Sequence, residues 1–177
     1  PERWHRVAFG AGTTGTLFLM PRLLMATTVV EMADHFLEEL ATQVTQAGWS
    51  VDLATNMSGS TPRKRPYSRV IDVPWGRGFK NPGGTLHSFR IMSGVLRHGG
   101  YQVVHTHSPT ASAITRLAAP PHTATQIVYT AHGFHFGRGQ PRLRSAVVKA
   151  VELALLRRTD VLVAINAEDY EWGVKHA

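Results

Sequence analysis

The stretch 103–109 reads Val-Val-His-Thr-His-Ser-Pro, and the stretch 127–136 reads Ile-Val-Tyr-Thr-Ala-His-Gly-Phe-His-Phe. Each begins as a run of β-forming residues and then breaks into histidine, hydroxyl, proline or glycine residues. This is the pattern of a short buried strand that feeds a polar loop at its carboxyl end. In open α/β sheets, ligands bind in the crevice outside those ends. We therefore predict a parallel sheet with a ligand site beside these two loops.

Alternating strands and helices extend from these two segments toward both termini. Runs of β-forming residues predict the strands, and apolar residues at three- and four-residue steps predict the helices between them. The predicted strands are 22–28, 49–55, 70–74, 102–106, 126–130 and 161–165. The predicted helices include 85–97, 110–118 and 143–158. Strands that alternate with helices imply right-handed crossovers, so we predict an α/β fold with a Rossmann-like, doubly wound parallel sheet.

The first helix is predicted from an apolar stripe that follows strand 22–28. Its residues recur at helical spacing, and they are Met32, Phe36, Leu37, Leu40 and Val44. Gly48 stands where helices commonly end on a glycine in the left-handed conformation. In the helix over 85–97, the expected buried stripe begins at Leu86.

Residues 1–19 contain a G-x-G-x-x-G pattern at 10–15, directly after a short run of β-forming residues. A dinucleotide-binding loop requires a helix that starts at the third glycine and offers its N-terminus to pyrophosphate. Pro21 leaves too little room for such a helix. We therefore expect residues 1–19 to be an N-terminal extension outside the fold, and the domain to comprise residues 20–177.

The bulk composition limits the class of protein. A chain of 177 residues with 43% apolar and 18% charged residues has the composition of one globular domain. It contains no cysteine, which excludes a disulfide framework and a thiolate metal site. The net charge of +7 favours an anionic partner, and nucleic acid, an anionic membrane surface and phosphate-bearing substrates all fit it.

Three blocks of sequence occur in a fixed order in the second half of the chain. They are His105–Pro109 with Arg116, then Tyr129–Phe136, then Thr159–Tyr170. In this order and spacing they resemble the N-terminal, acceptor-side domain of family 4 glycosyltransferases of the GT-B fold. Within that family they are similar to the bacterial branch that builds capsular and exopolysaccharides. The resemblance is weaker over 22–100 and does not extend before Met20.

The resemblance implies a function as well as a fold. It implies the N-terminal half of a GT-B enzyme, a retaining hexosyltransferase in cell-surface polysaccharide synthesis. Such an enzyme moves a sugar from a nucleotide-sugar donor to a polyprenyl-diphosphate-linked or other glycan acceptor. The resemblance implies no metal and no cofactor, because protein groups neutralise the leaving diphosphate. The family's C-terminal donor domain is absent from these 177 residues, so we expect the chain to be inactive in isolation.

Two other functions fit parts of the sequence. A GT-B-like UDP-sugar 2-epimerase domain has a similar architecture, but it needs acid and base carboxylates near the cleft, where this sequence carries histidines. A basic, nucleic-acid-binding Rossmann-like domain fits the net charge, but it needs aromatic residues among its arginines. In the basic stretches 63–69 and 138–144, the only aromatic residue is Tyr67. We therefore expect no nucleic-acid partner.

The resemblance and the strand-end positions together indicate the site residues. The family has a histidine that faces the donor sugar at the position of His132, and we assign His132 as the catalytic residue. Its imidazole can donate to a sugar hydroxyl, and its backbone carbonyl can stabilise a developing oxocarbenium ion. The alternative for His132 is a loop histidine that only hydrogen-bonds the backbone. The alternative for Asn166 is that it caps a helix. The expected substrate-binding residues are Thr27, Thr28, His107, Ser108, Gly133, Phe134 and Asn166.

Four histidines lie at the two strand ends. His105 and His107 are two residues apart, and His132 and His135 follow the neighbouring predicted strand. Imidazole is a common zinc ligand, but this spacing matches no compact zinc motif, and no carboxylate or thiol stands beside the histidines. We interpret them as the lining of an acceptor pocket and assign no metal.

A basic stretch after the second strand end bears on localisation. Arg138, Arg142, Arg144 and Lys149 place positive charge on and before the predicted helix 143–158. This charge fits a peripheral contact with an anionic membrane and an ordinary solvated helix face equally well. No stretch reaches the roughly 20 apolar residues of a membrane span. We expect a cytoplasmic protein, with the inner face of the cell membrane as its surface of contact.

Overall fold

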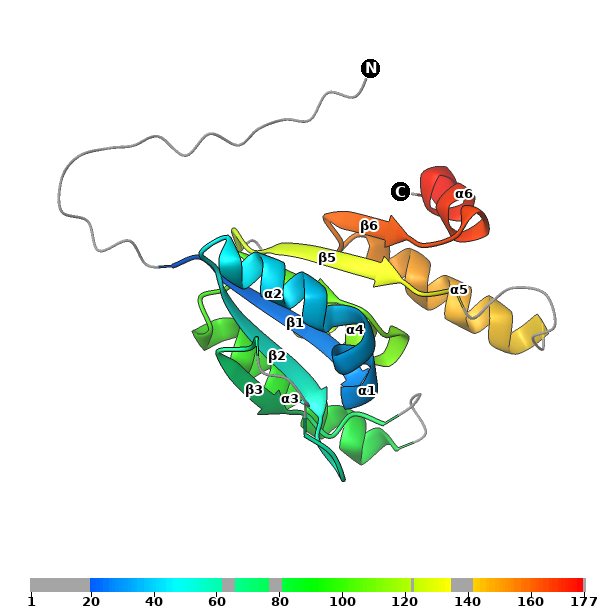
Figure 1. Cartoon of the computed structure of the whole chain (residues 1–177). Coiled ribbons are helices and arrows are strands. Elements are labelled where there is room, and N and C mark those ends of the chain that lie inside the picture. The colour runs from blue at the N-terminus through cyan, green and yellow to red at the C-terminus, as the bar shows by residue number, and fades with distance from the viewer. Residues whose placement is uncertain (1–19, 62–65, 77–80, 122, 135–141, 177) are drawn as a thin grey trace, which may run out of the picture.

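The computed structural model describes residues 20–61, 66–76, 81–121, 123–134 and 142–176, and places their strands in one parallel sheet. The strand order is β3-β2-β1-β4-β5-β6 (Figure 1). The strands are β1 (Arg22–Val29), β2 (Ser50–Asn56), β3 (Arg69–Asp72), β4 (Val103–Thr106), β5 (Gln126–Ala131) and β6 (Val161–Ala164). This order, which reverses between β1 and β4, is that of the Rossmann-type doubly wound sheet. The predicted fold class is confirmed.

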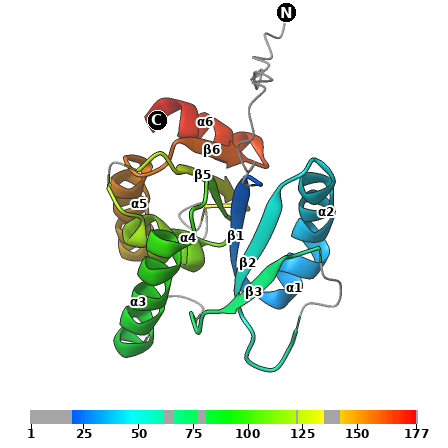
Figure 2. The same ribbon diagram turned by 90° about the vertical axis from the view of Figure 1, so that its left-hand side faces the viewer.

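Helices cover both faces of the sheet. Figure 2 shows α1 and α2 on one side of the sheet and α3, α4 and α5 on the other. The helical segments are α1 (Val30–Met32), the π-helix η1 (Ala33–Leu37), α2 (Glu38–Gln46), α3 (Pro82–His98), α4 (Pro109–Ala118), α5 (Arg142–Leu156) and α6 (Ala167–His176). The last of these, α6, follows β6 and packs against it.

The central strand β1 is buried on both faces, which explains its continuous apolar sequence. Leu24 and Ala26 point into a core that α3 and α4 cover. Leu23 and Met25, which alternate with them, point into the core under η1 and α2. β1 is therefore held in place by side chains on both sides of the sheet.

The helix after β1 departs from the predicted stripe. Its second turn is a π-helix, in which each backbone hydrogen bond spans one residue more than in an α-helix. Ala33, Leu37 and Ala41 occupy the buried face, whereas Phe36 is 64% exposed. The prediction that Phe36 packs in the core was therefore wrong. The prediction for Gly48 is confirmed, since it follows α2 with a φ of +88°.

Two further results concern the predicted elements. Leu86 lies in the first turns of α3 and is 48% exposed, so its assignment to the buried stripe was also wrong. The extension 1–19, with its pattern at 10–15, lies outside the described residues, as do His135 and Arg138. The predictions about them, and the domain limits of 20–177, stay predictions. No helix in the described part of the chain is long and apolar enough to cross a membrane.

Candidate functional site

The carboxyl ends of β1 and β4 meet where the strand order reverses, which is the usual ligand position in such sheets. Ala26 pairs with Thr106, so the residues that follow each strand emerge side by side. The hydroxyl of Ser108 accepts the backbone N–H of Thr28 at 2.6 Å and lies 3.1 Å from the hydroxyl of Thr27. The fold thus brings together three predicted substrate-binding residues, and in this structure they bond one another.

Trp75 supports the same strand end, and the sequence patterns did not indicate it. Its indole N–H donates to the carbonyl of Thr27 at 3.0 Å, and its side chain is fully buried. A buried tryptophan usually finds a partner for this N–H. The bond fixes the backbone of β1 just before the candidate site. The only local signal is a large aromatic residue soon after a short strand.

Four rings form a row across these strand ends, and we call them the ring row. His105 lies in β4, and its ring is tilted by 42° against that of His107, with ring centroids 4.0 Å apart. His132, after β5, is 5.8 Å from His107 and 6.0 Å from Phe36 of η1. Exposure differs sharply along the row, from 3% for His107 to 64% for Phe36. The ring row therefore runs from the protein interior to the surface.

The imidazoles of the ring row are neutral at pH 7. Burial, with a smaller contribution from the neighbouring His132, lowers the pKa of His105 to about 4. Burial, with the two nearby imidazoles, lowers the pKa of His107 to about 2. Burial also lowers the pKa of His132. Neutral imidazole can donate or accept a hydrogen bond, but it brings no positive charge to a bound anion.

The hydrogen bonding of the three imidazoles is incomplete. Nε2 of His105 lies 2.8 Å from the hydroxyl of Thr130. Both ring nitrogens of His107 and Nε2 of His132 are buried without a hydrogen-bond partner. Buried polar atoms of this kind are uncommon and occur at functional sites. Within the described residues, no group of three or more histidine or acidic side chains is placed to hold a metal ion.

The loop that carries His132 is anchored to α6. Gly133 has a φ of +111°, a conformation that glycine adopts far more readily than other residues. The backbone N–H of Phe134 donates to both carboxylate oxygens of Asp169, at 3.2 Å each. The ring of Phe134 lies against Trp172, with centroids 4.7 Å apart. Phe134, predicted to contact substrate, thus packs against α6 in this structure.

Asn166 caps α6, as its alternative assignment predicted. Its side-chain oxygen accepts the backbone N–H of Asp169 at 2.9 Å, and its amide group donates to the Asp169 carboxylate at 2.7 Å. Asp169 is buried, and sequence reasoning did not single it out as a site residue. The signal was present as an Asn-x-x-Asp pattern, which has the residue spacing of a capping box. A substrate contact by Asn166 stays a prediction.

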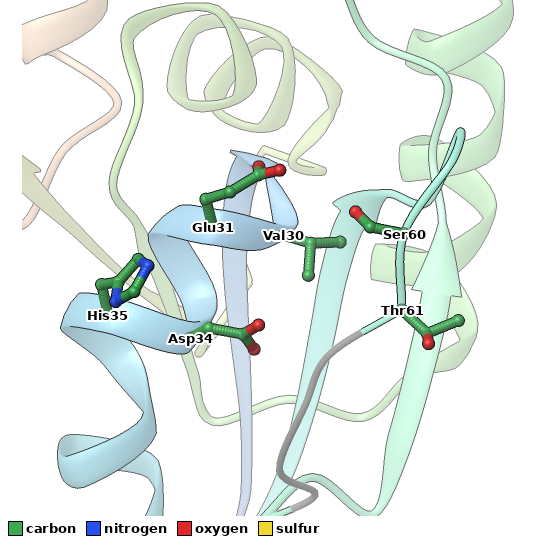
Figure 3. A pocket seen from close by; sticks show the side chains of 6 residues that line it. All are labelled: Val30, Glu31, Asp34, His35, Ser60 and Thr61. Carbon is green, nitrogen blue, oxygen red and sulfur yellow. The ribbon is translucent and has the colours of Figure 1, made fainter.

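A small polar pocket lies at the same edge of the sheet, between the start of the first helical segment and the chain after β2 (Figure 3). Its lining carries two carboxylates, an imidazole and two hydroxyls. The residues are Val30, Glu31, Asp34, His35, Ser60 and Thr61. Groups of these kinds can hydrogen-bond the hydroxyls of a sugar.

The sequence of the chain is similar to those of known glycosyltransferases. Residues 33–176 match the model of Glycosyltransferase Family 4. EpsD of Bacillus subtilis (strain 168), which is named as a glycosyltransferase, is 38% identical over 128 residues, covering 71% of this chain and 32% of EpsD. The UDP-Gal:alpha-D-GlcNAc-diphosphoundecaprenol alpha-1,3-galactosyltransferase of Escherichia coli is 31% identical over 81 residues, covering 46% of this chain and 21% of that enzyme.

A solved structure of sucrose-phosphate synthase from Thermosynechococcus elongatus shares the fold, with a TM-score of 0.66 and 16% identity over 88% of this chain and 44% of that chain. The sheet is thus a Rossmann-like α/β domain of the kind found in GT-B glycosyltransferases. This chain spans about a third or less of the length of the curated relatives it matches. The family model covers most of the chain. On this evidence, the chain belongs to Glycosyltransferase Family 4.

Proposed function

We propose that this chain is the acceptor-binding domain of a retaining hexosyltransferase. The enzyme would move a sugar from a nucleotide-sugar donor to a polyprenyl-diphosphate-linked glycan during cell-surface polysaccharide synthesis. Family membership supports the reaction class, and the name of the Escherichia coli relative includes both a UDP-sugar and a diphosphoundecaprenol acceptor. The observation that carries the proposal is the neutral imidazole of His132 beside Gly133, at the edge where such sheets bind ligands.

His132 would act on the transferred sugar. A neutral imidazole can hydrogen-bond a sugar hydroxyl, and the backbone carbonyl beside Gly133 can face the positive charge that develops on the sugar ring. A glycine at this point allows the ligand to approach the backbone closely. Thr27, Thr28 and Ser108, gathered at the ends of β1 and β4, would form the acceptor side of the crevice.

The test uses the enzyme in which this chain is joined to a donor-binding domain. His132→Ala should lower kcat by about two to three orders of magnitude, the range for losing one transition-state-stabilising group, with an unchanged melting temperature. His87→Ala, at an exposed position on α3, is the matched control and should leave kcat unchanged. A near-normal kcat for His132→Ala with both substrates saturating would show that the assignment is wrong.

Two comparisons extend this test. His107→Ala should raise the acceptor KM with a smaller change in kcat, as expected for a role in the acceptor pocket. The 177-residue chain alone should transfer no sugar, because the proposed donor site lies in the other domain. Sugar transfer by the chain alone would contradict the proposal that the donor site lies in the other domain. Release of an epimerised UDP-sugar would instead support the epimerase alternative.

We also propose that the protein is cytoplasmic and contacts the inner face of the membrane through α5. Leu143, Val147 and Val151 lie on successive turns of its outer face and are 80%, 56% and 41% exposed. Arg142 and Lys149 are exposed elsewhere on the same helix, about 100° or more around its axis from this stripe. An exposed apolar stripe on a helix that also carries basic residues suits an anionic lipid surface, where a polyprenyl-linked acceptor would reside.

Vesicle co-sedimentation tests the membrane contact. The protein should bind vesicles that contain anionic lipid more tightly than zwitterionic vesicles, and added salt should weaken the binding. Val147→Glu should reduce binding, whereas Leu86→Glu on α3 should not, although both positions are exposed. Equal binding by the two variants, or binding without any preference for anionic lipid, would contradict the proposal.

A further inference from the structure

Phe36 is the exposed end of the ring row. Phe36, Phe89 and Phe134 are the phenylalanines within the described residues, and of these Phe36 alone is exposed. A single exposed apolar side chain is ordinary on a protein surface. Its position is not ordinary, since its ring is in edge contact with that of His132, the proposed catalytic residue.

The backbone explains why Phe36 is exposed there. In η1, Ala33 and Leu37 are both fully buried beneath the helix, and Phe36 lies on the turn between them. Single π-helical turns are rare and occur frequently at functional sites. The turn keeps the core packing of its two neighbours while it leaves Phe36 at the surface. The exposure of Phe36 is therefore built into the fold rather than left by a loose side chain.

We propose that Phe36 is a stacking platform for a pyranose ring of the acceptor glycan, a role that rests on the proposed function. A pyranose has an apolar face of C–H groups, and a flat aromatic ring can bury that face with little loss of side-chain freedom. The centroid of Phe36 is 6.0 Å from that of His132. A sugar on Phe36 therefore lies beside the ring to be transferred, where its attacking hydroxyl must be positioned.

The neighbouring polar pocket strengthens the assignment to a sugar. Asp34 and His35 of η1, the segment that carries Phe36, and Glu31 of the preceding α1 line the pocket of Figure 3. Sugar sites commonly combine an apolar surface with a few polar groups that fix orientation. A polyprenyl chain, by contrast, would gain nothing from carboxylates and hydroxyls beside it.

Binding to the 177-residue chain gives a test that does not depend on transfer. The probe is an alpha-D-GlcNAc-diphosphate ester with a short alkyl chain, titrated while the imidazole NMR signals of His132 are followed. Phe36→Ala should weaken binding about tenfold, the size of one aromatic contact with its buried area. Phe36→Trp should restore binding, and Phe36→Leu should not. Leu117→Ala, at an exposed position on α4, is the control and should bind as the wild type does.

Four results would overturn this inference. The first is wild-type binding that is absent, or that Phe36→Ala leaves unchanged. The second is full rescue by Phe36→Leu, which would indicate apolar contact without stacking. The third is that Phe36→Ala weakens the binding of alpha-D-GlcNAc-diphosphoundecaprenol but not that of the short-chain ester. This result would show that the prenyl chain, and not the sugar, contacts Phe36. Transfer by the joined enzyme with an unchanged acceptor KM in Phe36→Ala would also overturn it, while the proposed function would stand.

Discussion

The carboxylate of Asp169 accepts the backbone N–H of Phe134, with each of its oxygens 3.2 Å from the nitrogen. The bond joins the loop after β5 to the first turn of α6, which are 35 residues apart in sequence. His132 lies two residues before Phe134 on that loop. Asp169, itself held by the amide of Asn166, is therefore placed to set the path of the backbone that carries the proposed catalytic residue.

Asp169→Ala should lower kcat at least tenfold in the joined enzyme, because small displacements of a catalytic group cost about this much or more. Asp169→Asn keeps one oxygen to accept the Phe134 N–H and should recover part of the loss. Asn166→Ala removes the cap and should cost about 1 kcal/mol of stability, but it leaves the bond to Phe134 intact. If Asp169→Ala reduced only the melting temperature and not kcat, a positioning role would be excluded.

Ser108→Ala tests the junction between β1 and β4. The variant leaves the backbone N–H of Thr28 buried without its partner at 2.6 Å. An unsatisfied buried donor costs about 1–3 kcal/mol, so the free energy of unfolding should fall by that amount in urea titrations. Ser68→Ala removes an exposed hydroxyl that accepts a hydrogen bond from Ser50 and should change stability by less than about 0.5 kcal/mol. Equal effects of the two substitutions would contradict this account of the junction.

The sequence predicts this fold well because its signals are local. Strand alternation, the left-handed Gly48 and the cap at Asn166 depend on neighbouring residues, and the structure confirms each. The errors have non-local causes. Phe36 is exposed because the helix packs on the sheet through Ala33 and Leu37, and the turn between these two residues is a π-helix. The spacing of apolar residues in the sequence does not predict a π-helical turn.

The candidate site was predicted in part. The strand ends indicated Thr27, Thr28 and Ser108, which the structure brings together. The ring row could not be predicted from the sequence, because its residues come from β4, the loop after β5 and η1, which are brought together only by the fold. The bond from Phe134 to Asp169 likewise connects two segments that no local pattern links.

A buried ion pair joins α4 to α5. Arg116 is fully buried, lies 2.9 Å from the Glu152 carboxylate, and places its guanidinium 4.4 Å from the ring centroid of Tyr129. Removing one partner leaves an uncompensated charge in the interior, whereas removing both leaves none. Sequence comparison with the family marked Arg116, but its partner lies 36 residues away and was not indicated.

Glu152→Gln should therefore lower the free energy of unfolding by about 3–5 kcal/mol. The double variant Arg116→Met with Glu152→Leu should be clearly more stable than the single variant, because it buries no unpaired charge. Lys149→Ala, an exposed change on the same helix, should have little effect. Urea titration of the four proteins measures these differences. A double variant less stable than Glu152→Gln would show that the pair contributes more than charge compensation.

Acid should destabilise the fold through the ring row. The pKa of His105 is about 4 and that of His107 about 2 in the folded chain, whereas an unfolded histidine has a pKa near 6.5. Between these values the unfolded chain binds protons that the folded chain does not, so stability falls as the pH drops below about 6.5. The loss continues down to about pH 4 for His105 and further for His107.

The variant His107→Gln measures how much His107 contributes to this dependence of stability on pH. Its side chain does not titrate, so the dependence of unfolding free energy on pH should become shallower by up to about one proton, or about 1.4 kcal/mol per pH unit. Urea titrations between about pH 5 and pH 6.5 measure this slope before most carboxylates titrate. His87→Gln, at an exposed position on α3, should keep the wild-type slope. If His107→Gln also kept it, the buried imidazole would be taking up its proton in the folded state, and the ring row would not be neutral.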